Sequence, residues 1–452
     1  MDTSSIRINP KTTIGLLIIV LILALLARVL ALQFVDPVSS LRVTESGMVA
    51  DNMAKGKGFT FELFGTRSAN PLRSFMPPLF PAINYAAIRL FADAVRGLSL
   101  IHIVLSTATV ALLFIVGYKL SDNVFIGLLS AAAFAFYPVL IIMAVYPPSL
   151  TLNLFLLLFY LATIVWLRDR PSPFLALIAG LLLGLGLLAR FMFIGLLPIT
   201  FLWLWLNRPK SLKLITVLSG LILLFALLTM LPWTVRNYRV HQRLVPVATN
   251  GGFVFWNGNN PFTTGSGHEV YTKRVAAYLG IEHDPSLPEV TDPWQPYPMP
   301  RVIADRAETM DELELDAAFY QAGLHFIRQN PDQWLDLLQA KLIGFWFFRS
   351  NIGGTYTASW TQYYKLGYIS LLALTIAGAF LTRRQWRSYM LLYLIFAYYT
   401  LIYAIFHVQT RYRWEIEPLF FILASATIWW LAERLLHHRP DKTNSTAFTQ
   451  PD

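Results

Sequence analysis

The chain has 452 residues but no cysteine, and only 14% of its residues are charged, whereas 56% are hydrophobic. The absence of cysteine excludes disulfide bonds and every metal site built from thiolates. The eight histidines form no HExxH motif or comparable ligand pair. An internal repeat, which would favour an inverted-repeat transporter, is also lacking. Few charges and long apolar runs, such as residues 14–29 and 214–231, together indicate an integral membrane protein.

Ten apolar stretches have the composition of membrane spans, for which about 20 residues cross ~30 Å of hydrocarbon. They cover residues 14–32, 98–118, 124–144, 150–167, 172–189, 192–206, 214–232, 364–381, 388–405 and 416–433. The predicted fold class is therefore all-α and polytopic, with about 10–11 transmembrane helices, amphipathic helices on the extracytoplasmic surface and one larger outer segment. Residues 341–348 are apolar but too short to cross, so we expect an interfacial or re-entrant helix there.

The net charge of +10 reflects topology rather than a nucleic-acid partner. Basic residues such as Lys119, Arg168, Arg208 and Arg384 gather in one set of short loops and tails. This distribution follows the positive-inside rule and predicts that both termini lie in the cytoplasm. The expected location is the cell inner (plasma) membrane.

The same topology divides the chain into five parts. We predict a cytoplasmic N-terminus at 1–13, a transmembrane bundle at 14–232 with a first outer loop at 33–97, a large extracytoplasmic segment with interfacial helices at 233–363, C-terminal transmembrane helices at 364–433 and a cytoplasmic tail at 434–452. Three polar segments follow odd-numbered spans, so they emerge on one face of the membrane: 33–97, 233–363 and 406–415. A site on the extracytoplasmic side is therefore expected.

The first outer loop supplies candidate carboxylates. Thr44 can cap a short amphipathic helix that begins with Glu45 and stops at Gly56. Glu45 is either a functional group or a solvated carboxylate that favours a helix N-terminus. Asp36 and Asp51 are competing carboxylates in the same loop.

Cations stand at several outer positions. Arg190 lies alone among apolar residues between the fifth and sixth spans, where it either has a partner or function or snorkels to the interface. Arg411 and Arg413 flank a tyrosine before the last span, and guanidinium groups bind phosphate through two parallel hydrogen bonds. Anchoring to lipid headgroups is the alternative for this pair. Arg28, near the outer end of the first span, is expected to snorkel.

Residues 250–261 are dense in amides, glycines and aromatic rings, a composition suited to stacking on a sugar and hydrogen-bonding it. A tight-turn scaffold is the alternative, because Asn-Gly pairs are common in turns. Residues 311–331 predict an amphipathic helix on the outer surface, whose charges face solvent.

Six motifs occur in a fixed order along the chain: Glu45–Gly47, Gly56–Phe59, Pro77–Pro81, Pro232–Tyr238, Gly258–Pro261 and Arg411–Pro418. Their order and topology resemble the GT-C superfamily of polytopic glycosyltransferases, in particular the bacterial family 39 branch, which is protein O-mannosyltransferase-like and ArnT-like. The resemblance extends from residue 14 to about residue 433. It implies transfer of a hexose or pentose, with inversion, from a polyprenyl-phosphate sugar to an acceptor on the extracytoplasmic side.

The resemblance also implies roles for individual residues. Glu45 would be the general base, with Asp51 the second candidate; the best-known members carry an Asp-Glu pair where this chain has Glu45 alone. The donor phosphate would be bound by Arg190, Arg236, Arg411, Arg413 and, more weakly, Lys341. The sugar or acceptor pocket would be shaped by Trp256, Asn257 and Asn259.

Cofactor and partner expectations follow from the same resemblance. The donor substrate is a polyprenyl-phosphate sugar, and the acceptor is a protein, a lipid or a glycan. Some relatives use a divalent metal, although this sequence has no ligand cluster that requires one. Membrane lipid is the remaining expected partner.

Other functions remain open at this stage. A transporter or flippase of lipid-linked sugars would also need basic residues, but the midplanes of the spans hold almost no charges. A ligase or polymerase of surface polysaccharide is a neighbouring enzymatic function. A non-catalytic scaffold that presents the outer segment is the third alternative.

Overall fold

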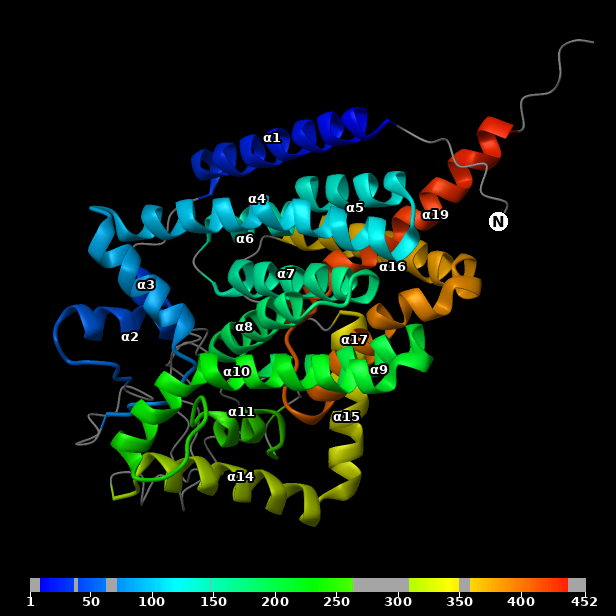
Figure 1. Cartoon of the computed structure of the whole chain (residues 1–452). Helices are drawn as coiled ribbons and strands as arrows, with labels where there is room; N and C mark the ends of the chain where they lie inside the picture. Colours follow the sequence, from blue (N-terminus) through cyan, green and yellow to red (C-terminus); the bar gives the residue numbers. More distant parts are fainter. Residues whose placement is uncertain are drawn as a thin grey trace, which may run out of the picture.

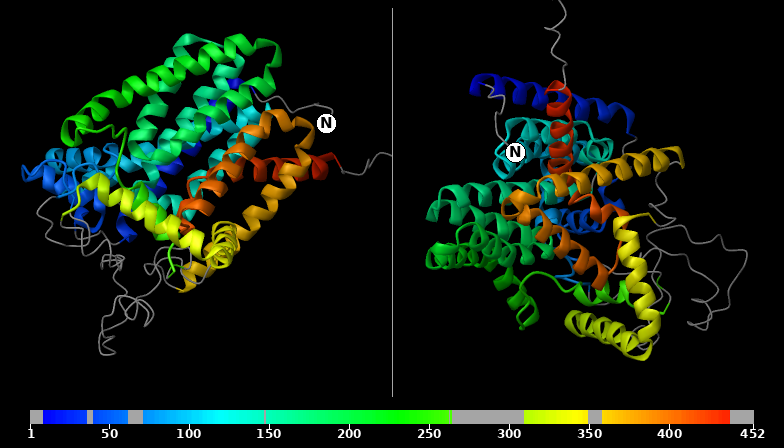
Figure 2. Two further views of the ribbon diagram at one scale, coloured as in Figure 1. Left: turned by 90° about the horizontal axis from the view of Figure 1, so that it is seen from below. Right: turned by 90° about the vertical axis from the view of Figure 1, so that its right-hand side faces the viewer.

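The computed structural model describes residues 9–35, 40–61, 71–146, 148–261, 263, 309–348 and 358–437. This part of the chain is helical, apart from short connections and one antiparallel bridge between Phe61 and Leu72. The long helices run side by side in a bundle, and the shorter helices of the polar segments gather beside it (Figures 1 and 2). The predicted fold class, an all-α polytopic membrane protein, is confirmed.

Seven of the described helices are long and apolar enough to cross a membrane. They are α1 (Pro10–Phe34), α4 (Ala94–Ser121), α7 (Leu150–Asp169), α10 (Leu212–His241), α16 (Ala358–Leu381), α17 (Trp386–Ile405) and α19 (Glu417–His437). Helices α5 (Val124–Phe136) and α6 (Pro138–Val145) together form an eighth span, bent by 55°. Two shorter apolar helices, α8 (Pro173–Ala189) and α9 (Leu196–Asn207), complete the bundle. The ten stretches predicted from hydropathy thus all lie on apolar helices.

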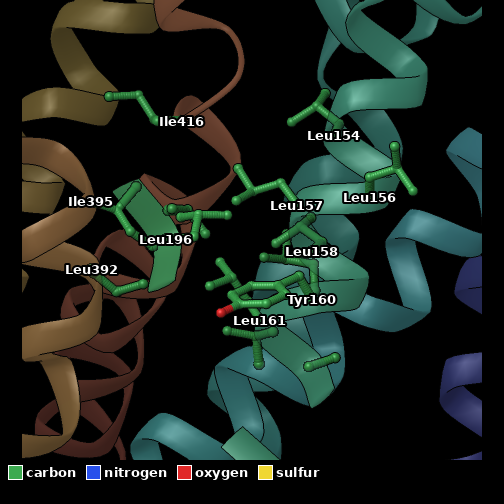
Figure 3. Close-up of a cluster of buried hydrophobic side chains, with 14 of the residues drawn as sticks. Leu154, Leu156, Leu157, Leu158, Tyr160, Leu161, Leu196, Leu392, Ile395 and Ile416 are labelled. Carbon is green, nitrogen blue, oxygen red and sulfur yellow. The ribbon is translucent and has the colours of Figure 1, made fainter. Parts of the chain in front are cut away.

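The core of the bundle surrounds α7, whose apolar window is 83% buried. Its leucines pack against residues of α9 and α17, as Figure 3 shows for Leu157, Leu196 and Ile395. Tyr160 lies in the same layer, where its hydroxyl is 2.7 Å from Oγ1 of Thr200. Because both polar atoms find a partner, α7 can be buried on all sides without an unpaired hydroxyl.

The bend between α5 and α6 has a direct cause in the sequence. Pro138 has no N–H, so the carbonyl of Phe134 loses its helical donor. Arg28 of α1 replaces it: its guanidinium donates to the carbonyls of Phe134 (3.5 Å) and Ala135 (3.1 Å) and to Ser106 of α4 (2.7 Å). The expectation that Arg28 snorkels is therefore wrong: its side chain is fully buried, because the broken helix offers it acceptors.

The polar segments form short helices of their own. These are α2 (Glu45–Ala54), α3 (Leu79–Leu90), α11 (Gly251–Gly258), α14 (Glu312–Gln329), α15 (Pro331–Trp346) and α18 (Thr410–Arg413). In Figure 1, α2 and α3 lie together at one end of the long helices, and α11 and α14 lie together below α10. The predicted helix of residues 311–331 is confirmed as α14, and α15 is not among the helices long enough to span. The expectation that the charges of α14 face solvent is wrong for Glu312, which is 7% exposed because it accepts hydrogen bonds from the N–H groups of Arg73 and Ser74.

A second small core joins these outer helices. Val49 of α2, Phe75 of the first outer loop, Trp256 of α11 and Phe319 of α14 pack into one apolar cluster. The rings of Trp256 and Phe319 lie 5.5 Å apart. The first outer loop and the large outer segment, which are some 200 residues apart in sequence, therefore form one structural unit.

Candidate active site at the outer end of the bundle

Glu45 stands in the first turn of α2, and local chemistry explains why the helix begins there. The Oγ1 atom of Thr44 accepts a hydrogen bond from the N–H of Gly47 at 3.1 Å, which confirms the predicted cap. A Cβ atom at Gly47 would lie 1.8 Å from the carbonyl oxygen of Leu41. Only glycine allows the preceding turn, Leu41–Val43, to fold back so tightly on α2.

The carboxylate of Glu45 has an unusual environment. Its side chain is accessible to solvent, yet the surrounding protein raises its pKa by desolvation. The positive charge of Arg411 acts in the opposite direction and lowers the pKa. Within the described part of the chain Glu45 makes no ion pair, so its carboxylate stays available.

Arg411 reaches the same place from the other end of the chain. It lies on α18, directly before the last span, and its side chain is exposed. Its guanidinium carbon lies 5.7 Å from the centroid of the Tyr412 ring. Among the described residues it donates to no protein acceptor, so Arg411 is an available cation whose charge acts on an available carboxylate.

Arg190 is placed differently. Its guanidinium forms an ion pair with Glu415 and donates a hydrogen bond to the hydroxyl of Tyr403 at 2.8 Å. It also lies over the ring of Tyr412, 5.1 Å from the centroid. Glu415 accepts a further hydrogen bond from Asn153 of α7 at 3.0 Å. The charge of Arg190 is thus largely neutralised by protein, although 26% of its side chain stays exposed.

Arg413 lies inside the bundle with no exposed surface. Its Nε atom donates to Glu417 at 2.9 Å, and its Nη2 atom donates to the hydroxyl of Tyr364 at 2.9 Å. Its Nη1 atom donates to the carbonyls of Phe345 (2.7 Å) and Phe347 (3.0 Å), where α15 ends. The structure therefore does not bring Arg413 to the place where Glu45 and Arg411 meet.

Arg236 organises the outer end of α10. Its Nη1 atom donates to the carbonyl of Arg73 (2.7 Å), to Ser74 (2.9 Å) and to Asn237 (3.0 Å). Its guanidinium also stacks over Trp233, 4.7 Å from the ring centroid. These contacts fix the first outer loop to α10, and the half-buried guanidinium is largely committed to them.

Lys341 and Asn259 bind one another. The Nζ atom of Lys341 donates to Oδ1 of Asn259 at 3.0 Å, and Trp334 donates to the same oxygen at 3.1 Å. Lys341 is 1% exposed, and burial lowers its pKa to about 7. Asn259 is itself fully buried and donates to the carbonyls of Phe255 and Ile405. Together they join α11, α15 and α17.

The stretch 250–261 folds as helix α11, which favours the scaffold alternative for most of it. Trp256 is 4% exposed and packs in the outer core, so its ring faces protein. A Cβ atom at Gly258 would lie 2.0 Å from the carbonyl oxygen of Phe406, so this glycine lets α11 approach the segment that carries Arg411. Asn257 is the exception, because it is buried and its Oδ1 atom finds no partner among the described residues.

Asp51 lies on α2 with Glu45 but is engaged by two cations. It forms ion pairs with Arg42 and with Lys55, the latter at 2.7 Å. Hydrogen bonds from these cations and their charges lower its pKa. The third carboxylate considered in this loop, Asp36, lies outside the described residues.

Sequence reasoning missed the glutamates of the last outer segment. Their spacing carries a signal, because Arg411–Glu415 and Arg413–Glu417 are both i, i+4 pairs, and such pairs can bond on one helix face. Only Arg413 pairs in this way, at 2.9 Å. Glu415 binds Arg190 instead, which is 225 residues away in sequence.

The described residues contain no group of three histidine, aspartate or glutamate side chains that could hold a metal ion. The dependence on a divalent metal therefore stays a prediction that rests on the family resemblance alone.

Comparison with known proteins establishes the fold. The sequence matches no protein-family model and no curated protein. The crystal structure of the Archaeoglobus fulgidus oligosaccharyltransferase in its apo form superimposes with a TM-score of 0.56 at 12% identity, over 94% of this chain and 51% of that chain. Oligosaccharyltransferase AglB of the same archaeon, in complex with an inhibitory peptide and a dolichol-phosphate, gives a TM-score of 0.54 at 11% identity, over 97% of this chain and 52% of that chain.

The chain thus spans about half the length of these solved structures. At this identity the likeness defines the architecture alone: the bundle has the fold seen in these archaeal oligosaccharyltransferase structures.

Proposed function

We propose that this chain is an integral-membrane glycosyltransferase of the family 39 type. It transfers a hexose or pentose from a polyprenyl-phosphate donor to an acceptor on the extracytoplasmic side, with inversion at the anomeric carbon. The observation that carries the proposal is that Arg411, from the last outer segment, acts through its charge on the carboxylate of Glu45, from the first. Both side chains are accessible to solvent, and the charge of Arg411 acts on the Glu45 carboxylate.

The two groups have complementary tasks in such a transfer. The Glu45 carboxylate accepts the proton of the acceptor hydroxyl as its oxygen forms a bond to the anomeric carbon. The bond from that carbon to the phosphate oxygen breaks on the opposite side of the sugar ring, and this back-side displacement inverts the configuration. The electron pair leaves with the polyprenyl phosphate, whose growing negative charge Arg411 stabilises.

The environment of Glu45 suits a general base. A raised pKa makes its carboxylate more basic than that of an ordinary glutamate, and a base works best when its pKa lies near the working pH. Asp51, the other candidate, has a lowered pKa and two cationic partners, so it is a weaker base. We therefore assign the role to Glu45.

The remaining predicted donor ligands support the site rather than bind phosphate. Arg413 and Lys341 are buried and donate to protein acceptors, and Arg236 holds the first outer loop. Arg190 is the second candidate for phosphate, because part of it is exposed, but Glu415 already neutralises its charge. Of the residues predicted to contact the sugar or acceptor, Asn257 is the one with an unpartnered amide oxygen.

The likeness to AglB supports the donor class, because that protein was captured with a dolichol-phosphate, which is itself a polyprenyl-type phosphate. The likeness to an oligosaccharyltransferase also makes glycosyl transfer the favoured activity for the fold. Transport or flipping of a lipid-linked sugar needs neither a general base nor a cation for a leaving group. It would therefore leave the available carboxylate of Glu45 and the available cation of Arg411 unexplained.

The decisive experiment measures the fate of radiolabelled polyprenyl-phosphate sugars in proteoliposomes, with delipidated host membrane proteins and glycolipids offered as acceptors. The Glu45→Gln variant should lose transfer by about 10²–10⁴-fold while it still binds donor. The matched control, Asp51→Asn on the same helix, should transfer at close to the wild-type rate. Near-normal turnover by Glu45→Gln with loss in Asp51→Asn would move the base to Asp51. Translocation of intact donor without release of polyprenyl phosphate would instead establish a flippase.

A further inference from the structure

A large polar cavity lies at the end of the bundle opposite Glu45. Helices α4, α7 and α9 end there and α17 begins there, whereas the other end of α17 contacts Asn259 and Lys341 on the outer side. The cavity has a volume of about 720 Å³. Its charged lining residues are Lys119, Arg168, Arg384, Arg387, Asp122 and Asp169.

Three of these charged residues bind one another and connect helix ends. Asp169 binds both Lys119 and Arg168, each at 2.8 Å. Arg168 also donates to Oγ of Ser388 at 3.0 Å, which joins α7 to the first turn of α17. These bonds join the ends of α4 and α7 to the start of α17 around the cavity.

Two of the lining arginines have no protein acceptor among the described residues. Arg384 and Arg387 are exposed, and among the described residues neither guanidinium donates to a protein acceptor. The guanidinium carbon of Arg387 lies 5.6 Å from the centroid of the Trp386 ring. With four cations and two carboxylates, the lining carries a net positive charge, and its two unpaired cations are the pair best suited to an anion.

The start of α17 adds to this potential. The helix begins at Trp386, and in the described structure no side chain caps its first turn. Residues 385–388 line the cavity, so the positive end of the helix dipole lies beside the two arginines. Trp386 is 41% exposed, as expected for an aromatic side chain at the level of lipid headgroups.

We propose that this cavity binds the phosphate of an anionic phospholipid headgroup from the adjoining leaflet. Arg384 and Arg387 would bind the phosphodiester through their planar guanidinium groups, next to the start of α17. Basic pockets between the ends of transmembrane helices are the kind of site that retains such headgroups. Membrane spans end at this level, so a lipid is presented to the cavity at far higher local concentration than a soluble anion. The proposal does not depend on the glycosyltransferase activity.

The test measures lipid retention by the full-length protein in an uncharged detergent, using native mass spectrometry. Dioleoylphosphatidylglycerol is the anionic probe, and dioleoylphosphatidylcholine is the zwitterionic one. The Arg384→Gln/Arg387→Gln double variant is compared with Lys210→Gln/Lys213→Gln. The control pair is exposed, lies at the same end of the bundle, removes the same charge and does not line the cavity.

We expect one tightly retained phosphatidylglycerol per wild-type chain and about tenfold or more weaker retention in the arginine double variant. The lysine control should retain the lipid like wild type, and phosphatidylcholine should dissociate from all three proteins. Equal loss in both double variants would mean general attraction to surface charge and would overturn the proposal. Displacement of the lipid by glycerol 1-phosphate at equal concentration would also overturn it, because the ligand would then be a soluble phosphate. Thermal unfolding of each variant without added lipid verifies that folding is intact.

Discussion

Arg411 and Arg413 lie two residues apart, yet they belong to different regions of the molecule. Arg413 points into the bundle, where each of its three guanidinium nitrogens donates to Glu417, to Tyr364 or to backbone carbonyls. Arg411 stays exposed, and its charge acts on Glu45. The buried arginine is thus committed to a fixed network, whereas the exposed arginine has no protein acceptor among the described residues.

The difference shows that a motif of two arginines is not one functional unit. A buried ion pair that loses one partner leaves an uncompensated charge, so it acts on stability. An exposed cation without a protein partner adds little to stability and can act on a ligand. The following predictions test this division, in order of decreasing effect.

The largest effect is expected for Arg413→Met. Removal of this side chain leaves Glu417 buried and without its cation, which costs about 3–5 kcal/mol. We expect a much lower midpoint of thermal unfolding, followed by tryptophan fluorescence in detergent. The matched control is Arg411→Met in the same short helix, which should unfold close to wild type. A stable Arg413→Met protein would show that the interior network does not hold the segment in place.

Arg411→Ala should lower the apparent affinity for the donor by about tenfold or more, because a charge-assisted hydrogen bond to phosphate is lost. Arg411→Lys should recover only part of this, since an ammonium group cannot reproduce the two-donor fork. The measurement is the apparent affinity for polyprenyl-phosphate sugar in the transfer assay. Arg239→Ala, another exposed arginine at the outer end of α10, serves as control. An equal loss of donor affinity in Arg239→Ala would mean that general surface charge attracts the donor.

The pH dependence of transfer should report on the same pair. The base is active when deprotonated, so the rate rises with pH through the pKa of Glu45, which burial has raised. Arg411 lowers that pKa, so Arg411→Ala should move the profile to higher pH at saturating donor. An unchanged pH profile would mean that the charge of Arg411 does not act on the general base.

The raised pKa also has a consequence for stability. The folded state binds the Glu45 proton more tightly than the unfolded state, so this group favours folding least when pH lies above its folded pKa. Glu45→Gln should therefore unfold at pH 7 at the same temperature as wild type or higher. A markedly lower midpoint would indicate a structural role for the carboxylate.

The smallest effect is expected for Asp51→Asn. Hydrogen bonds and ion pairs lower the pKa of Asp51, so its stabilisation is present at neutral pH and is lost as pH falls through that pKa. Its partners are largely exposed, which limits the loss to about 0.2–1 kcal/mol at pH 7. Thermal unfolding at pH 7 and at low pH measures this term. A strong loss of transfer at unchanged stability would contradict the assignment of Glu45.

The parts of the structure that follow from local sequence could be predicted. Hydropathy located all ten apolar stretches, because each of these helices presents a largely apolar surface to lipid or to its neighbours. Thr44 and Gly56 marked the limits of α2 through local backbone chemistry, and Gly56 adopts a φ of 77° just after the helix.

The parts that depend on distant partners could not be predicted. Arg190 looked isolated because Glu415 is 225 residues further along the chain. Asn259 looked like a sugar ligand, but its oxygen is taken by Lys341 and Trp334, which come from α15. Nothing local distinguishes Arg411 from Arg413, because the acceptors that hold Arg413 in the bundle include Phe345 and Tyr364, which are distant in sequence.

The hydrogen bonds from Arg28 to the broken helix also determine when α1 can dock during biosynthesis. Helix α1 buries little of its surface, and Arg28 lies at the centre of the stripe that it does bury, between Ala24 and Ala31. The acceptor carbonyl of Ala135 is made 107 residues after Arg28. At about 5–20 residues per second, the ribosome needs about 5–20 s to supply it. Until then the guanidinium can bond to the carbonyl of Ala24 in its own helix but lacks its acceptor on α5, so α1 completes its docking only after α5 has been made.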